Sequence, residues 1–121
     1  MPDLQLFSNL LPRSKMNDKI QILKELKKYL LVNFGSGIID VILFGSQLRS
    51  LEFSDSDFDV LIIMDKDYNW KDENRILDLC YDIDLKYNIL IDAHIISKNE
   101  LNSKRGKQPI FINAINSGVY A

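Results

Sequence analysis

Three aspartates have the type and spacing needed for a metal site. Asp57 and Asp59 stand one residue apart where an apolar run begins, and Asp92 interrupts a later apolar run. Side chains two residues apart on a strand point to the same face, so Asp57 and Asp59 would share one. Converging carboxylates repel unless a cation compensates them. Their oxygens are the natural ligands of hard ions such as Mg²⁺. A pair of such ions can promote displacement at a phosphate.

The stretch before the aspartates suits the other half of such a site. An apolar run ends at Gly45 and Ser46, ten residues before Asp57. Glycine lets a phosphate approach the backbone, and serine supplies a hydroxyl and an amide. Donors on one side and metal-binding acids on the other predict a nucleoside triphosphate site. Taken alone, a Gly-Ser or an Asp-x-Asp at a strand end is usually turn chemistry. The combination with Asp92 favours an active site.

Hydrophobic periodicity predicts the elements that must position these residues. Short, β-branched apolar runs predict buried strands at residues 38–45, 58–64 and 89–96. Helical spacing and end signals predict helices from 17 or 18 to near 35, from 67 or 69 to 88, after 97, and from 109 to before 118. We expect an α/β (α+β) domain with a small mixed sheet of at least three strands, covered by helices. Residues 1–16 would form an N-terminal arm, and residues 17–121 a single domain.

The connections fix the strand directions. The second strand, its helix and the third strand form a βαβ unit, which makes these two strands parallel. The loop between the first two strands is too short for a crossover, so they should be antiparallel. Gly45 and Ser46 would then meet Asp57 and Asp59 at one sheet edge, and Asp92 would reach the same level. His94 shares the face of Asp92. A hydrogen-bonded structural histidine is favoured there over a role beside the site.

Composition limits the remaining possibilities. The net charge of −2 argues against a broad nucleic-acid-binding surface. The basic cluster at residues 103–107 is interpreted as a solvated loop. The lone Cys80 excludes an internal disulfide and fits a reducing cytoplasm, and with a single histidine it argues against a structural zinc site. No apolar segment reaches the ~18 residues that span a membrane.

The residues also carry a family resemblance. "GSQLRSLEFSDSDFD", residues 45–59, resembles the signature of the polymerase-β-like nucleotidyltransferase superfamily, and residues 17–117 are similar to its minimal nucleotidyltransferases. This resemblance implies that Gly45 and Ser46 hold the triphosphate of ATP. Asp57 and Asp59 would ligate two Mg²⁺ ions.

The same resemblance implies roles for two further residues. Asp92 would be the third carboxylate, as a metal ligand or as the base toward the attacking hydroxyl. Arg49 would contact phosphate or substrate. Ser50 stands where the family usually has glycine, which leaves the path of this loop open.

The resemblance implies transfer of AMP from ATP to a hydroxyl of a partner protein. The implied partner is a small all-helical HEPN-type protein, with this chain as the antitoxin of the pair. Two alternatives remain open: a non-catalytic module that neutralises a helical partner by contact, and nucleotidyl transfer to a small molecule such as an aminoglycoside. Whether the chain forms an oligomer is also left open.

Overall fold

The computed structural model describes residues 12–45 and 58–121, with side chains from Asp18 onward in the first range. The elements in chain order are α2 (Pro12–Asn33), β1 (Ile38–Phe44), β2 (Phe58–Met64), α3 (Trp70–Tyr87), β3 (Ile91–Ser97), α4 (Lys98–Leu101), the 3₁₀ turn η2 (Arg105–Lys107), α5 (Pro109–Ser117) and β4 (Val119–Tyr120). The α+β class predicted from the sequence is confirmed.

The strands form one mixed sheet in the order β3-β2-β1-β4. β1 and β2 are antiparallel, and β2 and β3 are parallel, as their connections predict. The sheet has one more strand than the periodicity indicated, because β4 adds two residues antiparallel to β1. β3 is therefore one edge of the sheet, and β2 lies inside it.

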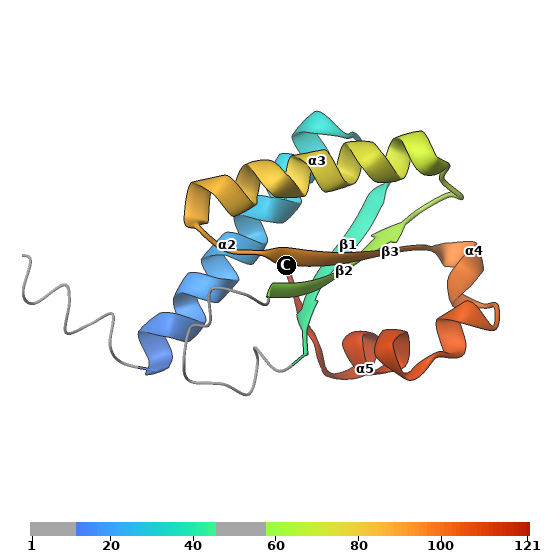
Figure 1. Ribbon diagram of the computed structural model, residues 1–121. Helices are drawn as coiled ribbons and strands as arrows, with labels where there is room; N and C mark the ends of the chain where they lie inside the picture. Colours follow the sequence, from blue (N-terminus) through green and yellow to red (C-terminus); the bar gives the residue numbers. More distant parts are fainter. Residues whose placement is uncertain (1–11, 46–57) are drawn as a thin grey trace, which may run out of the picture.

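Helices cover both faces of the sheet (Figure 1). On one face, Val60 and Ile62 of β2 pack into a core cluster with residues of α2 and α3. On the other, Leu61 and Ile63 pack against Phe111 of α5. Alternate strand residues thus enter different cores, which explains why the strands are apolar almost throughout. Cys80 lies in the first core, where burial raises the pKa of its thiol to about 12.

The starts of α2 and β3 differ most from the sequence prediction. α2 begins at Pro12 rather than at residue 17 or 18, because proline fits the first turn of a helix and the residues after it continue the spiral. β3 begins at Ile91 rather than residue 89. Asn88 adopts a left-handed conformation with φ 54°, and the Asp84 carboxylate accepts a hydrogen bond of 2.8 Å from the Ile91 backbone N–H. Residues 89–90 therefore belong to the connection between α3 and β3. The division into an arm and a domain at residue 16 stays a prediction.

The predicted start of α4 and the predicted start and end of α5 are confirmed. Ser97 and Glu100 form a capping box at α4, Pro109 begins α5, and Gly118 follows its end. None of the helices in residues 12–45 and 58–121 combines the length and the apolar character that crossing a membrane requires.

Gly118 permits the close packing of α5 on β1. A Cβ atom at this position would overlap the Ala114 carbonyl oxygen and the Ile42 side chain, and would lie 2.9 Å from the Leu43 carbonyl oxygen. Because backbone atoms cannot give way cheaply, we expect Gly118→Ala to lower the free energy of unfolding by about 1–3 kcal/mol in urea denaturation. The exposed neighbour Ser117 is the matched control: Ser117→Ala should change it by less than about 0.5 kcal/mol. Equal effects of the two substitutions would contradict this packing.

Candidate functional site

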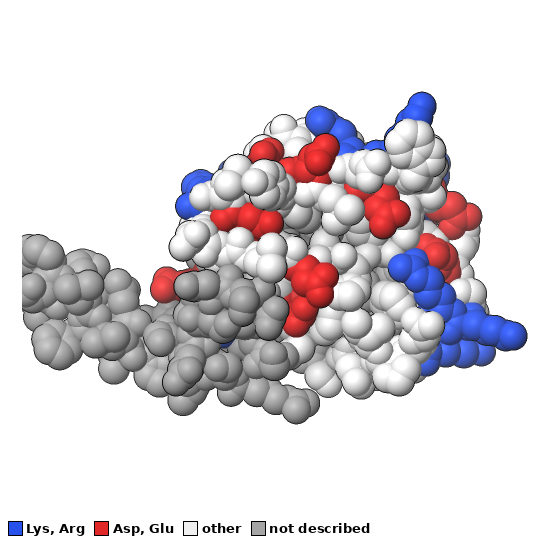
Figure 2. All heavy atoms as spheres, viewed as in Figure 1, with Lys and Arg blue, Asp and Glu red and all other residues white. Residues whose placement is uncertain are grey.

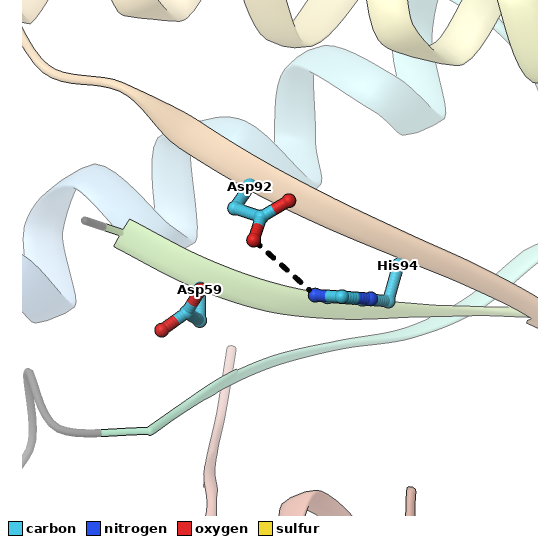
Figure 3. Close-up of side chains that lie close together, drawn as sticks. All are labelled: Asp59, Asp92 and His94. Carbon is cyan, nitrogen blue, oxygen red and sulfur yellow. Dashed lines mark ion pairs between the residues drawn. The ribbon is translucent and has the colours of Figure 1, made fainter. Parts of the chain in front are cut away.

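The sheet register brings two of the predicted acids together. Asp59, the second residue of β2, lies opposite Asp92 in the parallel strand β3. Residues that face one another in neighbouring strands project from the same face, so both carboxylates lie on one side of the sheet. Ligand atoms of Asp59, Asp92 and His94 all lie within 4.8 Å of one another. Figure 3 shows the three side chains gathered beside β2 and β3.

The cluster is partly open to solvent. The Asp92 side chain is 62% exposed and that of His94 is 29% exposed, whereas Asp59 is half-buried. This gradient follows from the sheet order, because Asp92 and His94 stand on the edge strand and Asp59 on an inner one. A ligand can therefore approach from the side of Asp92, while Asp59 forms the inner wall.

His94 lies beside the acids. Its Nε2 is 3.5 Å from Oδ2 of Asp92, and its ring lies against that of Phe44 with 5.6 Å between the ring centroids. The sequence predicted the shared face of His94 and Asp92 but favoured a structural role. The geometry favours the role beside the site, because Nε2 faces the Asp92 carboxylate (Figure 3) and the ligand atoms of His94 and Asp59 lie within 4.8 Å of one another. The two-residue spacing was the signal for this position.

Gly45 closes the other side of Asp59. Its φ is 87°, in the left-handed region that glycine adopts without cost. A Cβ atom built on Gly45 would lie only 2.6 Å from Oδ2 of Asp59. Both the backbone conformation and the nearby carboxylate therefore require glycine at the end of β1. Gly45 thus lies beside Asp59, as the strand directions predicted for these two residues.

Three predicted site residues lie outside the described residues. These are Ser46, Arg49 and Asp57. Their roles as phosphate donor, phosphate or substrate contact, and metal ligand stay predictions. The described part of the site therefore consists of Gly45, Asp59, Asp92 and the neighbouring His94.

The described donors fit a divalent cation. Two carboxylates and an imidazole offer two oxygens and one nitrogen at spacings that a single ion can bridge. A cation would also offset the repulsion between Asp59 and Asp92, which otherwise opposes their convergence.

The basic cluster at residues 103–107 belongs to the opposite end of the strands. Arg105 donates hydrogen bonds to Glu100, at 2.7 Å, and to the hydroxyl of Tyr68, at 3.2 Å. Arg105 therefore links the turn after α4 to Tyr68, whose hydroxyl donates a hydrogen bond to the Ile95 carbonyl of β3, and is not simply a solvated side chain. In Figure 2 a group of basic side chains gathers at the end that holds α4, and acidic side chains occupy the middle of the same face. The candidate site is thus remote from this basic group.

Comparison with known proteins supports a specific chemistry for this site. A family model described as a nucleotidyltransferase domain matches residues 20–117. The chain is 32% identical over 103 residues to the candidate protein adenylyltransferase MJ0604 of Methanocaldococcus jannaschii, across 85% of this chain and 96% of the relative. It is 37% identical over 79 residues to a second candidate protein adenylyltransferase of that organism, MJ0141, across 65% and 80% of the two chains. No solved structure matches the chain significantly.

The contact between Gly45 and Asp59 can be measured with a double-mutant cycle. Gly45→Ala should destabilise the protein for two reasons: an L-residue in the left-handed region costs about 1–2 kcal/mol, and its methyl group would displace the Asp59 carboxylate. In an Asp59→Ala background only the first cost remains. We expect a coupling free energy of about 0.5–3 kcal/mol from urea denaturation of the four proteins. Additivity of the two substitutions would show that the described approach of Asp59 to Gly45 is wrong.

Proposed function

The chain belongs to the nucleotidyltransferase domain family and is an enzyme that transfers a nucleotidyl group, and we propose that it moves AMP from ATP to a hydroxyl of a partner protein. The observation that carries this proposal is the register of β2 and β3, which sets Asp59 directly opposite Asp92. Two carboxylates held at one level of the sheet form the inner and outer walls of a cation site.

Asp59 and Asp92, together with Asp57 from outside the described residues, are the proposed Mg²⁺ ligands. When bound, the metal supplies charge stabilisation at the phosphate oxygens and lowers the pKa of the attacking hydroxyl. Two ions are proposed from the family resemblance, and the donor set described above can contact at least one of them.

The chain's own residues are proposed to assist the attack of the acceptor hydroxyl on ATP. The acceptor oxygen attacks the α-phosphorus of ATP, the bond to the bridging oxygen breaks, and pyrophosphate leaves. Asp92 is the residue proposed to take the proton of the hydroxyl, because it is the more exposed of the two acids and stands on the edge strand. Gly45 is proposed to hold the triphosphate at the turn after β1, as the family resemblance implies, because glycine lets a phosphate approach the backbone.

The nature of the acceptor is proposed from the relatives and from the family resemblance. Both relatives carry names that assign them provisionally to protein adenylylation. We propose ATP as the donor and a protein hydroxyl as the acceptor on that basis. A small all-helical HEPN-type protein is the proposed partner, with this chain acting as its antitoxin, because minimal nucleotidyltransferases are commonly paired with such proteins.

Labelling with ATP tests this function directly. The full chain is purified with the protein that co-purifies with it and is incubated with Mg²⁺ and ATP labelled at either the α- or the γ-phosphate. We expect the α-label on the partner, an intact-mass increase of one AMP, and no γ-label. Removal of the metal with a chelator should stop the labelling. Transfer of the γ-label, or labelling that survives the chelator, would contradict the proposal.

Asp59→Asn should reduce labelling at least about a hundredfold, because a ligand is lost from the wall of the site while the shape of the side chain is kept. Asp65→Asn is the matched control, since Asp65 directly follows β2, at the end of the strand opposite to Asp59, and lies 3.5 Å from Lys98. That control should label like the wild-type protein. Normal labelling by Asp59→Asn would contradict the ligand role of Asp59. If Asp59→Asn does not label the partner but still neutralises it fully, neutralisation by contact alone becomes the better account.

A further inference from the structure

We propose that His94 binds the cation directly, beside Asp59 and Asp92, and that it shifts the ion preference of the centre from Mg²⁺ toward borderline ions such as Co²⁺ and Zn²⁺. This inference rests on the proposed function, which needs a cation between the two carboxylates but needs no imidazole. Nitrogen ligands favour later divalent ions, whereas oxygen ligands suit Mg²⁺. One histidine therefore changes which ion the centre selects.

The spacing of the donor atoms is that of metal ligands. Nε2 of His94 lies 3.5 Å from Oδ2 of Asp92. Two ligands about 2.1 Å from one ion stand roughly 3.0 Å apart at an octahedral right angle and roughly 3.4 Å apart at a tetrahedral angle. An N–H···O hydrogen bond would instead bring the two atoms to about 2.7–3.2 Å. The pair is thus wider than a hydrogen bond and close to the spacing of ligands on a shared ion.

The third donor completes the set. An oxygen of Asp59 lies within 4.8 Å of both of the other ligand atoms, so the three donors surround one point on this face of the sheet. They come from two strands whose register is fixed, with Asp59 opposite Asp92 and Leu61 opposite His94. Donors on paired strands are held more rigidly than donors on loops, which suits a defined ligand geometry.

Phe44 restrains the imidazole. The two rings are tilted by 56° with their centroids 5.6 Å apart, and Phe44 itself is buried with 8% exposure. The His94 side chain is also less exposed than that of Asp92, at 29% against 62%. Less side-chain freedom is therefore lost when Nε2 binds an ion, which favours the direct ligand role.

A different role for His94 makes a different prediction. If His94 only oriented the Asp92 carboxylate through their ion pair, removal of His94 would lower the affinity for every divalent ion by a similar factor. If Nε2 is itself a ligand, removal of His94 lowers the affinity for Co²⁺ and Zn²⁺ far more than the affinity for Mg²⁺. The ratio of the affinities for Co²⁺ and Mg²⁺ therefore separates a ligand from a positioning residue.

The test uses the full chain without ATP. Co²⁺ binding is followed by its visible absorbance and by calorimetry, and Mg²⁺ binding by competition against Co²⁺. For His94→Gln we expect the affinity for Co²⁺ to fall by at least about tenfold, since loss of a supporting second-shell group alone costs 10–100-fold. The affinity for Mg²⁺ should fall much less. The absorbance should also lose the intensity that a nitrogen ligand contributes.

Two further variants complete the experiment. His94→Asp keeps a donor at the position but replaces nitrogen by oxygen, so it should bind Mg²⁺ at least as well as His94→Gln does and prefer Co²⁺ less than the wild-type protein does. Asp65→Asn, remote from the cluster, should leave the affinity ratio unchanged. Equal losses of Co²⁺ and Mg²⁺ affinity in His94→Gln, or no loss of either, would overturn the proposal. Labelling of the partner by the wild-type protein tests the proposed function, whereas the metal affinities test the role of His94. Failure of one proposal can therefore be distinguished from failure of the other.

Discussion

The parallel pairing of β2 and β3 is the constraint on which the candidate site depends. It sets Asp59 opposite Asp92, at one level and on one face of the sheet. Without a counterion this arrangement is unfavourable, because like charges in one site repel. The structure holds it nevertheless, since the surrounding strand residues are anchored in apolar cores on both faces. The stability of the two cores therefore offsets the cost of bringing the two carboxylates together, a cost that a bound cation would reduce.

The same constraint shapes the neighbouring residues. Asp59 also lies opposite Phe44 of the antiparallel strand β1, so the residue after Phe44 meets the carboxylate directly. Only glycine fits there, which links Gly45 to the position of Asp59 rather than to the turn alone. One inner aspartate thus explains the glycine on one side of it and the exposed aspartate on the other.

The fold was largely predictable from the sequence because short connections leave few topologies. The βαβ unit made β2 and β3 parallel, and a loop too short for a helical crossover made β1 and β2 antiparallel. Together these directions placed Asp59 and Asp92 at the same end of the strands. β4 was missed, since two residues, Val119 and Tyr120, carry no periodicity. The start of α2 was also missed, because the apolar residues before it show no regular spacing and Pro12 alone did not mark a first turn.

The candidate site was predictable in its spacing but not in its side-chain geometry. Residue spacing put His94 on the face of Asp92, yet the direction of its ring depends on Phe44, which lies in a different strand fifty residues earlier. Likewise, a sequence pattern cannot show that a methyl group on Gly45 would touch Asp59. Both features depend on which residues face one another in neighbouring strands. How those side chains then contact each other is determined by packing.

The position of a bound ion along the strands can be measured directly. Mn²⁺ added in substoichiometric amounts broadens the NMR signals of nearby backbone amides. A cation held by Asp59 and Asp92 should broaden the signals of Gly45, Asp59 and residues 92–94 most, with the effect fading along β2 and β3 toward Met64 and Ser97. Broadening centred on the Met64 and Ser97 end, or spread evenly over the exposed acids of α3, would contradict a metal centre at this edge of the sheet.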